Sequence, residues 1–129
     1  MSITDIPILS KLHTRMHWHQ DRQRVLAENV ANSDTPNFRA RELKELKFDG
    51  TAAPGALTLA TTHTAHVGTA GASKFQAIRA NHIETRPGGN SVNIEDEMLK
   101  VAQNQMDYQA ATALYTRGLG LIKTALGKR

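Results

Sequence analysis

Residues 94–126 read IEDEMLKVAQNQMDYQAATALYTRGLGLIKTAL. Selected positions in this stretch recur at alternating spacings of four and three residues, which is the a/d pattern of a coiled-coil helix. They are Ile94, Met98, Val101, Gln105, Tyr108, Thr112, Tyr115, Leu119, Ile122 and Leu126. The stretch therefore predicts one long helix, on the order of 50 Å in length at 1.5 Å per residue.

The residues at both ends of this stretch are those that favour a helix. Asn93 is a good N-cap, and Glu95, Asp96 and Glu97 crowd the first turn. Lys123 lies near the other end, so the order of charges complements the helix dipole. We interpret the three acids as dipole partners rather than as a catalytic or metal-binding cluster, because adjacent residues on a helix point in different directions.

A second stripe with the same spacing occurs near the N-terminus. It comprises Leu9, Leu12, Met16, His19, Gln23, Leu26 and Val30. The pattern predicts a helix from about Ile6 to Asn32, with Pro7 at an early helical position and Asp5 as its cap.

The chain between the two helices divides into three parts. Pro36 and the turn formers around it end the first helix, and Asn37 tolerates the left-handed conformation. Residues 39–48 fit a short helix or an edge strand equally well. The insert from Thr51 to Asn90 is rich in Gly, Ala, Thr and Ser and predicts irregular structure. It contains two candidate strands, at residues 57–59 and 75–78.

These elements predict a mainly α fold in which long N- and C-terminal helices form a coiled-coil-like pair. We expect residues 1–50 to form the first helix, the turn and an extension. Residues 51–90 form an irregular or weakly β central insert, and residues 91–129 form the second helix. The second helix and residues 1–32 are expected to make one structural domain.

Composition limits the classes of function. The 129 residues carry a net charge of +4, but the cations are scattered and do not alternate with aromatics, so nucleic-acid binding is not indicated. Cysteine is absent, which removes disulfides and thiolate metal sites. No stretch approaches the roughly 20 apolar residues of a membrane span. The N-terminus shows no pattern of a cleaved secretory signal, so we expect the chain either to stay in the cytosol or to leave by a route that needs no such signal.

No enzymatic or metal chemistry is indicated. His13 and His17 lie one helical turn apart, as metal ligands can, but no third ligand is evident. His63 and His66 have the same weakness. The chain has no phosphate-binding loop and no nucleophile beside a base. We therefore predict no catalytic residue, no cofactor, no metal and no small-molecule substrate.

The apolar surface of the second helix is wider than a lone coiled coil needs. It is extended by Ala102, Ala110, Ala111, Ala113, Leu114, Leu121 and Ala125. A monomeric bundle would cover this surface with further helices, which the sequence does not supply. Self-association through the two stripes is therefore the favoured interpretation.

One motif connects these features to a known family. Residues 29–38 read NVANSDTPNF and resemble the N-terminal motif of bacterial flagellar rod and hook axial proteins, roughly NxANxxTPG followed by an aromatic residue. The matching positions are Asn29, Ala31, Asn32, Thr35, Pro36 and Phe38. Asn37 stands where the family usually has Gly, and Asn is the commonest substitute at a left-handed position.

Within that family the chain resembles the proximal rod type of the basal body more than the related C-type rod protein. The chain is short, and residues 39–49 follow the Thr-Pro motif directly, as in that type. Residues 89–98 and 104–109 resemble its NxVxxExEM and NQxxYQ patterns. The resemblance covers both ends of the chain and little of residues 51–90.

The resemblance implies a structural subunit of the flagellar rod. Such proteins are exported through the flagellar type III apparatus without a cleaved signal, and they polymerise in the periplasm into the drive shaft around the export channel. The implied partners are copies of the chain, other rod proteins, the adaptor protein at the membrane ring and the export apparatus. A soluble coiled-coil adaptor or export chaperone is the main alternative, and a basic nucleic-acid-binding protein is the third.

Overall fold

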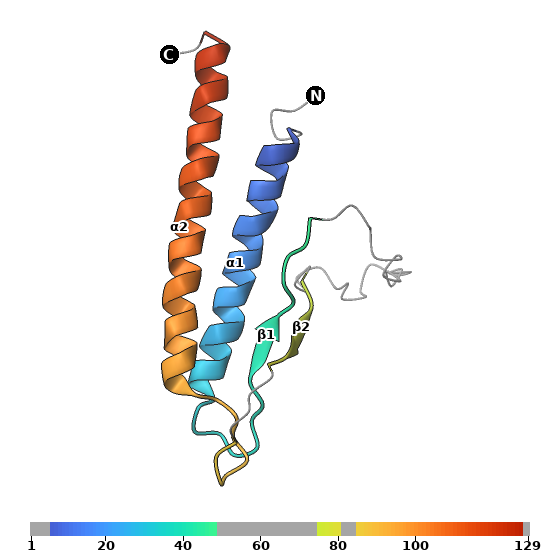
Figure 1. The fold of residues 1–129 in the computed structure, drawn as a ribbon, viewed down its shortest axis with the longest axis vertical. Helices are drawn as coiled ribbons and strands as arrows, with labels where there is room; N and C mark the ends of the chain where they lie inside the picture. The colour runs from blue at the N-terminus through green and yellow to red at the C-terminus, as the bar shows by residue number, and fades with distance from the viewer. Residues whose placement is uncertain (1–5, 49–74, 81–84, 128–129) are drawn as a thin grey trace, which may run out of the picture.

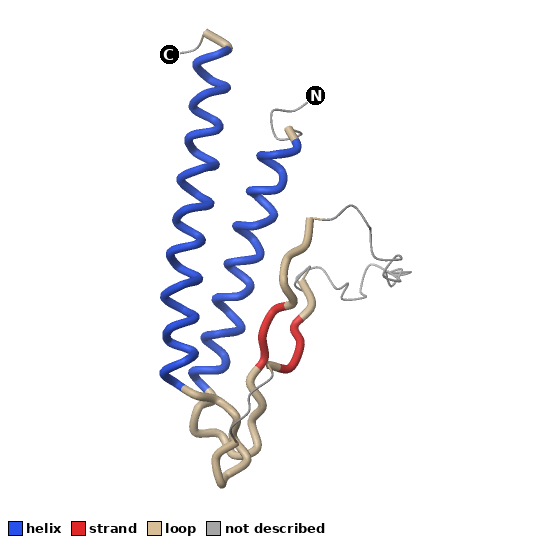
Figure 2. Tube along the Cα trace, viewed as in Figure 1, coloured by secondary structure: helices blue, strands red, loops and turns tan. Residues whose placement is uncertain are grey.

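The computed structural model describes residues 6–48, 75–80 and 85–127, and it is mainly helical (Figures 1 and 2). Two long helices, α1 (Pro7–Ala31) and α2 (Ile94–Ala125), pack side by side. Two short strands, β1 (Arg41–Leu43) and β2 (Ala77–Arg79), form a small sheet beside α1. The prediction of a paired-helix fold with a weakly β middle is confirmed. The candidate strand at residues 57–59 lies outside the described residues.

The start of α1 differs from the prediction in one respect. Pro7 occupies the first helical position, as expected, because its missing N–H has no intrahelical partner there. The N-cap is consequently Ile6, whose backbone is extended and whose side chain makes no capping hydrogen bond. The assignment of the cap to Asp5 was wrong, because Asp5 lies one residue too early in the chain.

The start of α2 is as predicted. The Asn93 side chain accepts a hydrogen bond from the Glu95 backbone N–H at 3.1 Å. The three acids lie in the first turn and Lys123 in the last. The helix runs to Ala125, one residue short of the predicted end.

The two helices are antiparallel, so that residues far apart in sequence become neighbours (Figure 1). Near the turn end of the pair, Asn29 of α1 bonds Glu97 of α2. Near the other end, a Cβ placed on Gly118 would lie 3.1 Å from a methyl group of Leu9. Because α2 has 32 residues and α1 has 25, the last turns of α2 continue past the start of α1.

The extension after the turn is a strand, which settles the choice left open by the sequence. β1 pairs antiparallel with β2 in the register Arg41 with Arg79, Glu42 with Ile78 and Leu43 with Ala77. The predicted strand at residues 75–78 is therefore present, displaced toward its C-terminal end. The chain after β1 continues along α1, where the Trp18 indole N–H donates to the Lys44 carbonyl at 3.0 Å.

The buried apolar side chains lie between the helices and beneath β1. They are Leu9, Val25, Leu26, Ala40, Leu43, Val92 and Ala111. This core is small for two helices of such length, and much of each helix surface stays open to solvent. In the described part of the chain, neither helix is long and apolar enough to cross a membrane.

Candidate assembly interface

The family-like turn is closed by a segment from the other end of the insert. The Asn90 side-chain amide donates to the Asn32 carbonyl at 2.9 Å and to the Thr35 carbonyl at 2.8 Å. The Phe38 carbonyl accepts from the Ser91 N–H at 3.1 Å. Carbonyls at the end of α1 have no helical partner, and Asn90 satisfies one of them. The turn is thus held by the residues that lead into α2.

Asn37 has the left-handed conformation expected of it, with a φ of 59°. Its N–H donates to the Gly88 carbonyl at 3.0 Å. Gly89 also has a positive φ of 77°, and a Cβ there would come within 2.4 Å of the Asn37 side-chain oxygen. Two constraints act at position 89: the backbone has a left-handed φ, and the Asn37 side chain lies too close for a Cβ. Position 89 therefore requires glycine.

Asn29, the first residue of the family-like motif, joins three elements. Its side-chain oxygen accepts from the Arg41 N–H at 3.0 Å, and its amide donates to the Arg41 carbonyl at 2.7 Å. The same amide donates to the Glu97 carboxylate at 2.8 Å. Asn29 is completely buried. It therefore pairs with β1 as a neighbouring strand would and also ties α1 to α2.

Glu97 continues this polar contact across the helix pair. It is completely buried, and Lys100 one turn later approaches its carboxylate at 2.8 Å. Lys100 also lies 3.6 Å from Glu42 of β1, which accepts from the Arg22 guanidinium of α1 at 2.8 Å. A buried carboxylate is tolerated when hydrogen bonds and an opposite charge compensate it. Glu97 is thus a structural residue, beyond the dipole role predicted for it.

A second polar contact lies midway along the helices. The Asn104 amide donates to the His19 carbonyl at 2.9 Å and to the Gln23 side-chain oxygen at 3.0 Å. The Asn104 side-chain oxygen lies 2.7 Å from His19 Nδ1. Because an amide oxygen can only accept a hydrogen bond, His19 Nδ1 is the donor and carries the proton. His19 and Asn104 are both buried. Polar side chains matched in this way fix the register of one helix against the other.

The structure places the N-terminal stripe between the helices. Leu9, His19 and Leu26 are buried, and the other four positions of the stripe are half-buried. Their predicted role in assembly between subunits remains a proposal.

Some positions of the C-terminal stripe face α1, and others face solvent. The line of α2 that faces α1 comprises Glu97, Val101, Asn104, Tyr108, Ala111, Tyr115, Gly118 and Ile122, which are buried or half-buried. Four of these are predicted stripe positions: Val101, Tyr108, Tyr115 and Ile122. Thr112 and Leu119, at the edge of this line, are half-buried. Ile94, Met98, Gln105 and Leu126 are exposed, Met98 at 55%. Four of the ten predicted stripe positions thus remain available to a partner.

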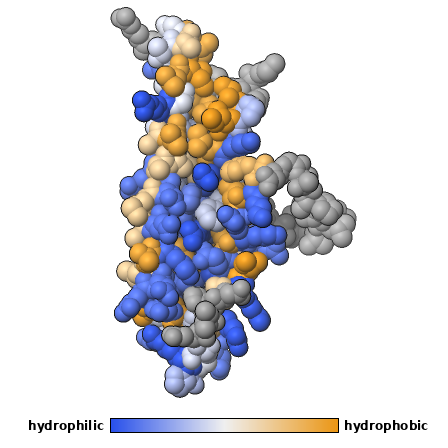
Figure 3. Space-filling model, viewed as in Figure 1, coloured by the Kyte–Doolittle hydropathy of each residue, from blue (hydrophilic) through white to orange (hydrophobic). Residues whose placement is uncertain are grey.

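Further large apolar side chains are exposed on α2. Leu99, Met106, Leu114 and Leu121 have 70, 64, 58 and 68% of their surface open to solvent. Apolar surface gathers over the upper part of the helix pair, while the lower part is mainly polar (Figure 3). Exposed patches of this kind mark sites of protein interaction.

The other candidate sites show little organisation. The rings of His13 and His17 are 4.5 Å apart and both side chains are exposed. In the part of the chain that the structure describes, no three His, Asp or Glu side chains gather as a metal site would require. His63 and His66 lie outside the described residues.

Several curated proteins that resemble the chain share one description. A protein of Proteus mirabilis is 33% identical over 119 residues, which cover 80% of the chain and 86% of that protein. An Escherichia coli K12 protein is 32% identical and covers 79% of the chain and 85% of its own length. Each is described as flagellar basal body rod protein FlgB. The chain belongs to the FlgB family.

The FlgB likeness extends beyond these relatives. The Agrobacterium fabrum FlgB is 29% identical over 117 residues, covering 88% of the chain and 87% of that protein. No protein-family model matches the chain. The resemblance inferred from residues 29–38 and 89–109 is confirmed. The names favour the FlgB type over the C-type rod protein and over an adaptor or chaperone.

Sequence reasoning missed the polar residues that hold the FlgB-like motif and the helix pair in place. Asn90, Glu97 and Asn104 are polar residues in or beside an apolar pattern, and a polar residue there is ordinarily assigned to solvent. Their spacing contained a usable signal, because Glu97 and Asn104 are seven residues apart and continue at Ala111 and Gly118. That line has the same heptad spacing as the apolar stripe and could have been tested beside it.

Proposed function

We propose that the chain is a structural subunit of the flagellar basal-body rod at its proximal, membrane end. It polymerises through its terminal helices to form the drive shaft and to enclose the export channel. The observation that carries this proposal is the match to FlgB proteins over about 85% of their length. The exposed apolar side chains of α2 support it, because a monomer gains nothing from exposing them.

We further propose that its partners are copies of itself and other rod proteins. The other proposed partners are the membrane-ring adaptor and the flagellar type III export apparatus. We propose that the rod lies in the periplasm and that the chain is exported without a cleaved signal. No catalytic role, cofactor or metal is proposed. These assignments follow the resemblance of the motif and the names of the relatives.

The two helical stripes have different roles in this proposal. The N-terminal stripe and the buried or half-buried positions of the C-terminal stripe hold α1 against α2. The exposed positions, of which Ile94, Met98 and Leu126 are apolar, meet neighbouring subunits. Burial of that surface stabilises the polymer by roughly 25 cal/mol per Å² of apolar area.

The turn motif has a positioning role in this proposal. Asn29 and Asn32 to Phe38 set the direction in which the chain leaves α1, and Asn90 holds that direction. The extension then lies against α1 through Trp18 and not across the helix pair. A rod subunit needs this geometry because neighbouring copies must meet the same surface at each step.

Replacement of the chromosomal copy by Met98→Asp tests the proposal. Met98 is exposed, so the chain should fold normally, and the charge should block packing against a neighbour. We expect loss of swimming and absence of the chain from purified basal bodies, with export of the variant retained. Gln103→Asp on the same helix is the matched control, since Gln103 is already polar and exposed. Normal swimming of the Met98→Asp strain would contradict the role of this stripe.

Localisation of the native chain separates the proposal from the adaptor hypothesis. A rod subunit is recovered with purified basal bodies, whereas a soluble adaptor or export chaperone is found only in the cytosol. Recovery exclusively in the cytosol would overturn the proposed function.

A further inference from the structure

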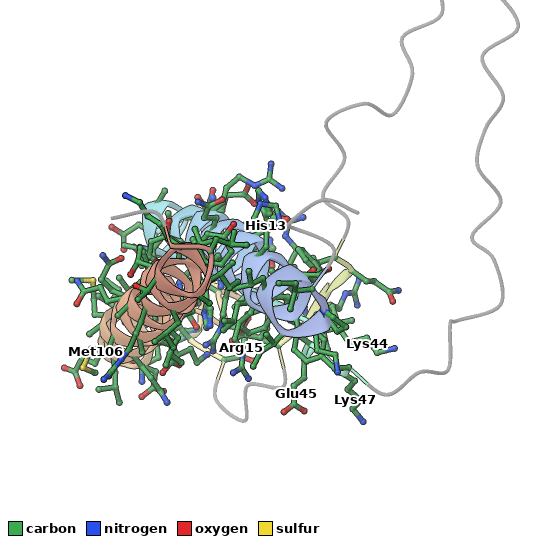
Figure 4. All side chains as sticks on the ribbon, turned by 90° about the horizontal axis from the view of Figure 1, so that it is seen from above. His13, Arg15, Lys44, Glu45, Lys47 and Met106 are labelled. Atoms are coloured by element: carbon green, nitrogen blue, oxygen red, sulfur yellow. The ribbon has the colours of Figure 1, made fainter. Side chains whose placement is uncertain are left out.

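The elements of the chain lie in a row, so that α2 and β2 form its two outer borders (Figure 1). α1 packs against α2 on one side and against β1 on the other, and β1 pairs with β2. Figure 4 shows the row from above, with Met106 of α2 on the opposite side from Lys44 and Lys47 of the extension. A second copy placed beside the first therefore brings α2 of one chain next to β2 of the other.

Two arginines face each other across the small sheet. Arg41 is directly opposite Arg79 in the register. The neighbouring pair is hydrogen-bonded, since the Ala80 N–H donates to the Ala40 carbonyl at 3.0 Å. Bonded and non-bonded pairs alternate along an antiparallel ladder, so Arg41 and Arg79 form a non-bonded pair, the kind in which opposite side chains lie closest. Like charges in this position destabilise a sheet, and carboxylates that bind the pair relieve the repulsion.

The described part of the chain supplies one carboxylate to this pair. Glu28 of α1 forms an ion pair with Arg41. Glu42, the next residue of β1, points to the other face of the sheet and pairs with Arg22 at 2.8 Å. Among the described residues, none forms a hydrogen bond or ion pair with the exposed side chain of Arg79. The arginine pair can therefore bind one more carboxylate, at Arg79.

The outer border of α2 presents an acid of its own. Glu95, Leu99 and Met106 are exposed and are spaced four and seven residues apart, which places Glu95 on the same outer side of α2 as Met106. Lys100, the nearest cation of α2, approaches the buried Glu97 at 2.8 Å instead. Within the described ranges the Glu95 carboxylate has no cation paired with it, so it is available to a cation of another chain.

Asn29 shows that these charges lie at the same level along the helices. Its side chain bonds the backbone of Arg41 and the carboxylate of Glu97. Arg79 is directly across the sheet from Arg41, and Glu95 lies within one turn of Glu97. Arg79 and Glu95 are therefore at nearly the same height on opposite borders of the row.

We propose that Arg79 of one copy binds Glu95 of a neighbouring copy, with β2 of the first against the outer side of α2 of the second. This inference rests on the proposed rod function and names the surfaces that meet. A sideways step with little shift along the helices brings the two charges together, and Leu99 then lies level with Ala77. Complementary charges of this kind fix the register of an interface.

The contact is head-to-tail, because its two surfaces differ. Each added copy presents the same unused α2 and β2 borders, so the contact repeats around or along an assembly. A two-fold pairing of β2 with β2 would instead bring the arginines of both copies together, and repulsion between like charges disfavours it.

Cysteine cross-linking tests the contact directly, because the native chain contains no cysteine. Ala77→Cys and Leu99→Cys are introduced together, which leaves Arg79 and Glu95 in place. Cells that assemble basal bodies are oxidised before the rods are purified. We expect a ladder of disulfide-linked chains that disappears on reduction. Within one chain α1 lies between the two positions, so the bond forms only between copies.

Two matched variants serve as controls. Ala77→Cys alone should give no dimer. Ala77→Cys with Arg117→Cys should give no ladder, because Arg117 is exposed on α2 but lies about 27 Å further along it than Leu99. A dimer with Ala77→Cys alone, or an equal yield with Arg117→Cys, would overturn the inference. Chains recovered in basal bodies without an Ala77–Leu99 cross-link would overturn it while leaving the rod function intact.

Charge reversal tests the same contact in the cysteine-free chain. Arg79→Glu should abolish swimming, and Arg79→Glu combined with Glu95→Arg should restore it. Loss of swimming would not arise from unfolding, because a glutamate opposite Arg41 removes the repulsion within the sheet. Normal swimming with Arg79→Glu, or no recovery in the double variant, would contradict the pairing.

Discussion

At the scale of the residue, Asn29 shows how one side chain can define a motif. An amide offers a donor and an acceptor in the same plane, and Arg41 receives both. The remaining amide hydrogen reaches Glu97. An aspartate or glutamine would lose a donor or displace it by a methylene group, so the requirement for asparagine follows from geometry.

Asn29→Ala should destabilise the isolated chain by about 2 to 3 kcal/mol, because it leaves the part-buried backbone groups of Arg41 and the buried Glu97 carboxylate without this partner. The measurement is urea unfolding followed by far-UV circular dichroism. Gln109→Ala on the exposed surface of α2 is the control and should change the free energy of unfolding by less than about 0.5 kcal/mol. Equal effects of the two substitutions would contradict the role assigned to Asn29.

Gly89→Ala should cost about 1 to 3 kcal/mol, since its φ is positive and its new Cβ would meet Asn37. Asn37→Gly should be nearly neutral, because glycine adopts the left-handed conformation readily. In the Asn37→Gly background the cost of Gly89→Ala should fall, as the nearest clashing atom is gone. Thermal unfolding of the four chains measures this coupling, and strict additivity would refute it.

At the scale of the element, α2 uses several of its faces. One faces α1, one carries the exposed positions of the predicted stripe, and one, which includes Met106, points away from α1 (Figure 4). A helix inside a single globular domain needs only one apolar face. The extra faces of α2 are what a subunit of an assembly requires.

The two glycines late in α2 should respond differently to alanine. A Cβ at position 120 meets nothing within 4 Å, so Gly120→Ala should stabilise the isolated chain by up to about 1 kcal/mol through helix propensity. A Cβ at position 118 would lie 3.1 Å from a methyl group of Leu9. Gly118→Ala should therefore lose most or all of the stabilisation that helix propensity provides. Thermal unfolding of both variants tests this. Equal stabilisation would show that the helices adjust freely at this point.

At the scale of the whole molecule, the fold of one chain and its assembly depend on different residues. The hairpin of helices is held by a narrow line of contacts with polar pairs at Asn29–Glu97 and His19–Asn104. Most of the large apolar surface of α2 lies outside that line. Substitutions at adjacent positions of α2 should therefore have different effects: one should affect folding and the other assembly.

Leu121 and Ile122 provide that comparison. Leu121 is exposed, so Leu121→Asp should leave the free energy of unfolding within about 0.5 kcal/mol and abolish swimming. Ile122 is half-buried on the line of α2 that faces α1, and Ile122→Asp should lower stability by about 1 to 2 kcal/mol. Circular dichroism of the purified chains and swimming in soft agar measure the two effects. Normal swimming with Leu121→Asp would exclude this end of α2 from the interface.

The sequence by itself determined the two helices, their limits to within a residue or two, and the family, because heptad spacing, caps and the Asn29–Phe38 motif are local signals. It could not choose between helix and strand for residues 39–48, since β1 exists only through its pairing with Ala77–Arg79. It also could not show which positions of the C-terminal stripe face α1.

Only the tertiary structure decided those points. The contact line of α2 is set by Glu97 and Asn104 meeting Asn29, His19 and Gln23, which lie more than 60 residues away in the chain. A polar residue is stable in a helix interface only when its partner is present. That partner is a property of the antiparallel pairing and not of the local pattern, so periodicity alone cannot predict it.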